Sequence, residues 1–179
     1  MELLLKILVR FFGILGLILS IIPFQFKKHK QIVLCKMASE TSFAVQYFLV
    51  GAFTGAWLDL VSGLRNYLYY KFVKIGRSTT PIIIAFGALV VTLGAISWEG
   101  PRSLLPVGAK LITTVSYGMK KERLLRLITI PSCILWIIYN LFTGVWEGAV
   151  SDSLTLLSIL IAIYKFDIRN QKKEEPAAV

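Results

Sequence analysis

The sequence predicts an all-α integral membrane protein whose seven transmembrane helices form two parallel three-helix repeats joined by a linker helix. Three observations predict this fold: an apolar composition, seven apolar runs, and similarity between the two halves of the chain. Hydrophobic residues make up 56% and charged residues 17% of the 179 residues, and the mean hydropathy is +0.70. A soluble domain of this length could not bury so much apolar surface. The composition therefore predicts that a lipid bilayer surrounds the chain.

Each apolar run approaches the roughly 20 residues that a helix needs to cross a hydrocarbon core. We expect helices at residues 7–26, 33–52, 55–73, 79–98, 103–119, 123–142 and 146–166. The segments between these runs are too short to fold alone. Residues 1–170 therefore form a single transmembrane domain, and the polar residues 171–179 are expected to be a disordered cytoplasmic tail.

The first apolar run has the features of a signal peptide, because Lys6 and Arg10 precede its centre. No small-residue cleavage site follows Pro23, however, and the chain continues into a run of lysines. We therefore expect a retained helix. The two cysteines, Cys35 and Cys133, lie in the inner half of this topology and predict neither a disulfide framework nor a metal site.

The formal charge of +10 could indicate nucleic-acid binding, but the basic residues gather in alternate loops on one side of the membrane. They are Lys27, Lys28, Lys30, Lys36, Lys71, Lys74, Arg77, Lys120, Lys121, Arg123, Arg126, Lys165, Arg169, Lys172 and Lys173. By the positive-inside rule this side is cytoplasmic, which puts the N-terminus outside and the C-terminus in the cytoplasm. The charge predicts orientation, and no nucleic-acid partner is expected.

The two halves of the chain repeat short sequences. Phe-Thr-Gly-Ala-Trp at 53–57 returns as Phe-Thr-Gly-Val-Trp at 142–146, 89 positions later, whereas Ser39 matches Ser132 at a separation of 93. The difference of four residues predicts that the second copy has lost about one helical turn. We expect repeats at 7–73 and 103–166, with the helix at 79–98 as the linker that restores a parallel orientation.

Four local sequences carry a resemblance to a known family. They are Tyr47-Phe-Leu-Val-Gly51, Leu104-Leu-Pro-Val-Gly108, Trp136-Ile-Ile-Tyr-Asn140 and Phe142-Thr-Gly144. Over about residues 10–170 the chain resembles the bacterial inner-membrane YgjV-type family, which is similar in plan to the SWEET and PQ-loop transporters. The resemblance implies a 3+1+3 helix plan and a multi-pass protein of the bacterial inner membrane. The chain lacks a Pro-Gln pair, and the family supplies no substrate.

Charged residues within spanning helices are costly, so each one is a candidate functional site. From the rise of about 1.5 Å per residue, Asp59 lies about 6 Å below the outer end of its helix, Lys110 about 10 Å and Asp152 about 9 Å. The similar depths predict an ion pair between Lys110 and Asp152. Arg65 lies deeper and is expected to extend its guanidinium toward the cytoplasmic face.

Neutral polar residues extend these positions into stripes at helical spacing, which predicts a polar cavity at the interface between the repeats. The candidate solute-binding residues are Asp59, Ser62, Asn66, Lys110, Trp136, Asn140, Asp152 and Thr155. The alternative for each Ser or Thr is a hydrogen bond within its own helix or to a neighbouring helix.

The predicted function is transport of a small polar, sugar-like solute by alternating access, with the Lys110–Asp152 pair or a proton on Asp59 accompanying the switch. A non-transporting membrane scaffold or accessory subunit is the alternative. No phosphate-binding loop, paired histidines or nucleophile pattern predicts an enzyme or a cofactor. The expected partners are the bilayer and the solute. The sequence does not decide whether the protein forms a homo-oligomer.

Overall fold

The computed structural model describes residues 2–21, 29–119 and 122–164. Over these ranges the chain forms seven α-helices and one 3₁₀ turn, η2, at Pro101–Ser103. The helices are α1 (Glu2–Ile21), α2 (His29–Leu49), α3 (Phe53–Lys74), α4 (Thr80–Ile96), α5 (Leu104–Tyr117), α6 (Glu122–Thr143) and α7 (Trp146–Ala162). The seven predicted helices are confirmed, although α1 begins five residues earlier than expected. The predicted tail at 171–179 lies outside the described residues.

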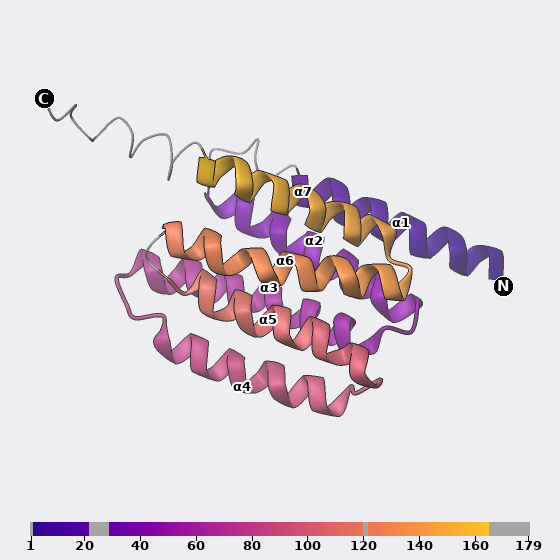
Figure 1. The fold of residues 1–179 in the computed structure, drawn as a ribbon, viewed down its shortest axis with the longest axis horizontal. Helices are drawn as coiled ribbons and strands as arrows, with labels where there is room; N and C mark the ends of the chain where they lie inside the picture. The colour runs from indigo at the N-terminus through magenta and orange to yellow at the C-terminus, as the bar shows by residue number, and fades with distance from the viewer. Residues whose placement is uncertain (1, 22–28, 120–121, 165–179) are drawn as a thin grey trace, which may run out of the picture.

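Six of these helices form a closed ring, in which they run side by side along the long axis of the molecule (Figure 1). Going around the ring, α1 packs on α2, α2 on α3, α3 on α5, α5 on α6, α6 on α7, and α7 on α1. The remaining helix, α4, packs outside the ring against α3 and α5. The ring therefore consists of two three-helix groups, α1–α3 and α5–α7. They meet at two contacts, α3 with α5 and α7 with α1, which we call the two seams of the ring.

Glycine ends α2 and α6 in the same way. Gly51 follows α2 with φ of 75°, and Gly144 follows α6 with φ of 73°, a left-handed conformation that favours glycine. The backbone N–H of Ala52 donates to the Tyr47 carbonyl at 2.9 Å, and that of Val145 donates to the Asn140 carbonyl at 3.0 Å. These two helix ends are 93 positions apart and have the same geometry.

The repeated Phe-Thr-Gly sequences occupy different structural positions. In the first copy Phe53 begins α3 and Gly55 lies within that helix, whereas in the second copy Thr143 ends α6 and Gly144 forms the turn. The expected loss of a helical turn is therefore wrong, because the matching turns keep the separation of 93 that Ser39 and Ser132 indicated.

The interior is polar and much of the outer surface is apolar, as expected for a bundle surrounded by lipid. Side chains such as Gln46, Asp59 and Arg65 are buried, whereas large apolar residues are exposed along α1, α3, α4, α6 and α7. By length and composition, Glu2–Ser20 and Arg123–Thr143 could cross a membrane, and Thr80–Ile96 is a shorter apolar helix. Polar residues facing inward lower the hydropathy of a helix such as α3, which carries Asp59, Arg65 and Asn66.

Candidate functional site

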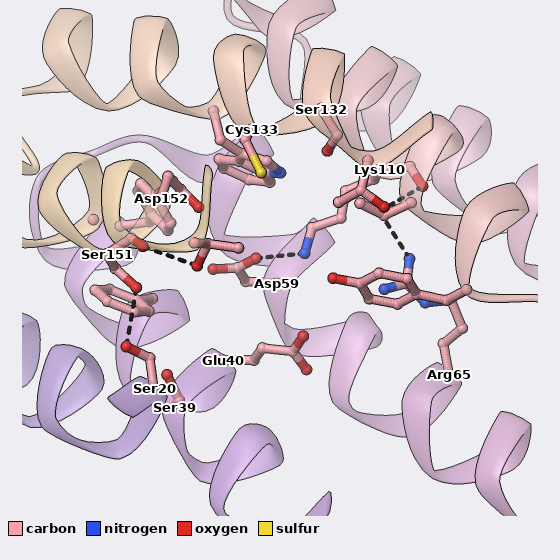
Figure 2. Close-up of a pocket in the computed structure, with 18 residues that line it drawn as sticks. Ser20, Ser39, Glu40, Asp59, Arg65, Lys110, Ser132, Cys133, Ser151 and Asp152 are labelled. Carbon is pink, nitrogen blue, oxygen red and sulfur yellow. Dashed lines mark hydrogen bonds and ion pairs between the residues drawn. The ribbon is translucent and has the colours of Figure 1, made fainter. Parts of the chain in front are cut away.

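All six helices of the ring line a polar cavity of about 180 Å³ (Figure 2). Its lining residues are Ser20, Ser39, Glu40, Phe43, Tyr47, Asp59, Arg65, Lys110, Thr113, Tyr117, Thr129, Ser132, Cys133, Trp136, Gly148, Ser151, Asp152 and Thr155. The outer helix α4 contributes none of them. The cavity therefore lies inside the ring, where side chains from both halves of the chain meet.

The buried ion pair of the cavity joins Lys110 of α5 to Asp59 of α3. Lys110 Nζ lies 2.7 Å from Asp59 Oδ1, and both side chains are almost entirely buried. The same ammonium lies 5.0 Å from the centre of the Trp136 ring, so a carboxylate and an aromatic face both stabilise it. The expected pair of Lys110 with Asp152 is wrong, because α5 packs directly against α3 and brings Lys110 to Asp59.

Asp152 is held by an amide instead of a cation. Asn140 Nδ2 donates to Asp152 Oδ2 at 2.8 Å, and the Tyr47 hydroxyl donates to Asn140 Oδ1. A chain of hydrogen bonds thus runs from α2 through α6 to α7. Figure 2 shows Asp59 between Lys110 and the side of the cavity where Asp152 lies.

Arg65 is buried inside the bundle, so the expectation that it extends to the cytoplasmic face is wrong. Its side chain is only 2% exposed. The guanidinium donates to Thr114 Oγ1 at 2.8 Å and to Asn66 Oδ1 at 3.1 Å, and it lies 5.5 Å from the centre of the Tyr117 ring. Arg65 therefore ties α3 to α5 across one of the two seams of the ring.

Of the eight candidate residues, five line the cavity: Asp59, Lys110, Trp136, Asp152 and Thr155. The other three lie beside it. Ser62 donates to the Leu58 carbonyl of its own helix at 2.8 Å, as the alternative for serine predicted. Asn66 contacts Arg65 and donates to Glu40 Oε1 at 2.9 Å, and Asn140 holds Asp152.

The sequence reasoning missed several lining residues of the first two helices. Glu40 and Tyr47 of α2, together with Ser20 of α1, line the cavity, and in Figure 2 the Glu40 carboxylate points toward its middle. Glu40 could have been found, because it is a carboxylate within an apolar run and the rule that selected Asp59 applies to it equally. Ser20 donates to the Leu17 carbonyl of its own helix at 2.7 Å, as many serines in membrane helices do, so no comparable signal marks it as a lining residue.

Side chains also bridge both seams at the end of the bundle that the sequence predicts to be outside. Arg10 Nη1 of α1 lies 2.7 Å from Glu147 Oε1 of α7, and Gln46 donates to the other oxygen of Glu147 at 2.8 Å. At the second seam, Thr54 of α3 and Ser103 share a hydrogen bond of 3.0 Å. Arg10 and Ser103 are 93 positions apart, as are Thr54 and Glu147, so equivalent positions bridge the two seams.

A family model described as a bacterial inner membrane protein, Imp-YgjV, matches residues 7–170. The chain belongs to this family. The match confirms the resemblance to the YgjV-type family and places the protein in the bacterial inner membrane. No curated protein and no solved structure is significantly similar to the chain. The Imp-YgjV description gives a location and no activity, so the chemistry of the cavity has to be argued from its residues.

The described part of the chain contains no group of three or more His, Cys, Asp or Glu side chains placed to hold a metal ion. Neither Cys35 nor Cys133 forms a disulfide in this part of the chain. What the cavity of this Imp-YgjV protein offers is a set of hydroxyls, carboxylates, two cations and aromatic rings. Such groups can bind and orient a small polar molecule by hydrogen bonds and charge.

Proposed function

We propose that the protein is a multi-pass transporter of a small polar solute, which binds in the ring cavity and crosses by alternating access. The observation that carries the proposal is a polar cavity inside a helix bundle whose outer surface is apolar. Burying charged groups in a membrane protein is costly, and such groups commonly mark the path of a solute or ion.

A two-fold internal repeat, α1–α3 and α5–α7, supports this proposal. Ten of the eighteen lining residues form pairs separated by 93 positions: Ser20 with Thr113, Ser39 with Ser132, Glu40 with Cys133, Phe43 with Trp136, and Asp59 with Asp152. In one such pair, Ser39 donates to the Gly16 carbonyl at 2.8 Å and Ser132 donates to the Ala109 carbonyl at 3.0 Å. The acceptors are also 93 positions apart.

In this plan α4 supplies the extra crossing that makes the two repeats parallel, as in SWEET transporters. The cavity then lies on the pseudo-two-fold axis, where repeat-built transporters bind their solute. The orientation follows from the basic loops, with the N-terminus outside and the C-terminus in the cytoplasm. Rocking of one repeat against the other would open the cavity to one side of the membrane and then to the other.

Uptake into liposomes containing the purified protein tests the proposal. A panel of radiolabelled sugars, nucleosides, amino acids and organic acids is offered to wild type, to Asp152→Ala, and to empty liposomes. We expect one solute class to enter faster with wild type than with either control. Wild-type uptake no faster than that of empty liposomes for the whole panel would favour the scaffold alternative.

A further inference from the structure

Lys110 occupies one half of the cavity in the way that a bound ligand would. Its ammonium lies 2.7 Å from Asp59 and 5.0 Å from the Trp136 ring centre. Proteins bind organic ammonium groups with this combination of a carboxylate and an aromatic face. The partners of Lys110 therefore define an ammonium-binding arrangement that the protein fills with its own side chain.

The other half of the cavity repeats this arrangement without the lysine. The residues 93 positions from Asp59 and Trp136 are Asp152 and Phe43, and both line the cavity. The position that corresponds to Lys110 is Leu17, whose side chain carries no charge. Leu17 packs against the apolar cluster that contains Phe43 and Tyr47, on the same side of the ring as α7.

The partners of Asp152 leave room for a cation. Within the described residues its carboxylate receives one hydrogen bond, from Asn140 to Oδ2, and it makes no ion pair. A cation beside Asp152 would be stabilised by its carboxylate, because opposite charges attract more strongly inside a helix bundle than in bulk water.

We propose that the solute bound in this cavity carries an ammonium group, with the Asp152 carboxylate as its counter-ion and the Phe43 ring beside it. The Ser151 hydroxyl donates to that of Ser20 at 3.0 Å, and the Ser20 hydroxyl donates to the Leu17 carbonyl at 2.7 Å, so both oxygens can still accept a hydrogen bond from the polar remainder of the solute. This inference rests on the proposed function, since it names the chemical class of the solute for the same cavity. It replaces the sugar-like solute expected from the sequence with an amine.

Thermal unfolding of the purified protein in detergent tests the proposal with matched solutes that differ by one amine. The pairs are glucosamine with glucose and ethanolamine with ethylene glycol, with sodium chloride as the probe for an inorganic cation. We expect only the amines to raise the midpoint temperature, since binding to the native state stabilises it. In Asp152→Asn the amine should bind about tenfold more weakly or worse. Equal stabilisation by the neutral partners, by sodium chloride alone, or by no probe would overturn the proposal.

A second variant places the missing lysine in the protein. In Leu17→Lys the new ammonium is expected to reach Asp152 as Lys110 reaches Asp59, so the variant should no longer respond to the amines. Leu17→Met has a similar length without the charge and should respond like wild type. A Leu17→Lys protein that unfolds at the wild-type temperature and still binds the amine would contradict the proposal. If Leu17→Lys does not fold, the Asp152→Asn comparison decides.

Uptake measurements separate this inference from the proposed function. If the amines bind through Asp152 but do not enter liposomes, the proposal of an ammonium site is supported and the proposal of transport is contradicted. If a neutral solute enters and the amines neither bind nor enter, transport stands and the ammonium site is wrong.

Discussion

The two aspartates of the cavity occupy corresponding positions in the two halves of the chain, yet they have different partners. Asp59 pairs with Lys110 at 2.7 Å, whereas Asp152 receives an amide hydrogen bond from Asn140 at 2.8 Å. The turns that precede them have matching geometry, since Gly51 and Gly144 have φ of 75° and 73° and the same backbone hydrogen bond closes each turn. The halves thus share a framework and differ in charge.

Because their partners differ, we expect one aspartate to contribute mainly to the stability of the bundle and the other mainly to solute binding. In the first half the protein provides its own cation, so the Asp59 charge is neutralised before any solute arrives. In the second half the corresponding lysine position is Leu17, and the carboxylate faces the cavity with an amide as its protein partner. Asp59 is therefore expected to act mainly in holding α3 to α5, and Asp152 mainly in binding.

Among the variants that test this comparison, Lys110→Met is expected to lose the most stability. Removing the ammonium leaves the Asp59 carboxylate buried without its ion-pair partner, which typically costs about 3–5 kcal/mol. The measurement is the unfolding midpoint in detergent for Lys110→Met, Asp59→Asn and the double variant. Because the double variant removes both charges, it should be more stable than Lys110→Met alone.

The matched control is Asp152→Asn, which replaces one carboxylate that has no ion pair in the described part of the chain. Its cost in stability without solute should be well below that of Lys110→Met. Equal losses in the two variants would mean that the two aspartates have the same role, and the comparison would fail.

The sequence predicted the helices well because their signal is local. Seven apolar runs and the glycines between them gave each helix to within a few residues at most ends. The partner predicted for Lys110 was wrong for a reason that is not local. Depth along a helix follows from the rise per residue, but it does not reveal which neighbouring helix a side chain faces. Lys110 and Asp152 have similar depths, and the packing of α5 on α3 brings Lys110 to Asp59 instead.

The proposed repeat was predicted from the sequence for a partly mistaken reason. Four residues that agree in sequence, in the pattern Phe-Thr-Gly-x-Trp, suggested a separation of 89, although one copy begins a helix and the other ends one. Sequence letters alone do not distinguish a helical glycine from a glycine with positive φ. The separation of 93 became clear only from turns and hydrogen bonds that have the same geometry.

Close packing of helices gives the next largest expected effect. A Cβ at Gly55 would lie 2.7 Å from Tyr139 Cε1, a buried ring with little room to move. Gly55→Ala should therefore destabilise by about 1–3 kcal/mol. Gly87 in α4 is the control, since a Cβ there meets no atom within 4 Å, and Gly87→Ala should be neutral or stabilising. Equal unfolding midpoints for the two variants would contradict the close contact.

The two glycine turns test the separation of 93 directly. Gly51→Ala and Gly144→Ala each force a residue with a Cβ into the left-handed region, which costs about 1–2 kcal/mol. Nothing lies within 4 Å of a Cβ at either site, so backbone strain alone should set the cost, and the two losses should agree closely. If the true separation were 89, Gly144 would correspond to the helical Gly55 instead of to Gly51. Equal losses of stability in Gly144→Ala and Gly55→Ala, with no loss in Gly51→Ala, would favour that separation.

The smallest expected effect compares the two seams of the ring. Equivalent positions hold an ion pair at one seam, Arg10 with Glu147, and a hydroxyl pair at the other, Thr54 with Ser103. Because the Arg10 side chain is 56% exposed, water and salt screen its charge, and Arg10→Gln should cost only about 0.2–1 kcal/mol. The loss should shrink further at high ionic strength, whereas that of Thr54→Val, which removes neutral hydrogen bonds to Ser103 and to the Ser97 carbonyl, should not depend on salt. Unfolding midpoints at low and high sodium chloride check both. If the stability losses of Arg10→Gln and Thr54→Val depended equally on salt, charge would not distinguish the two seams. The difference in charge between the two halves would then be limited to the two aspartates.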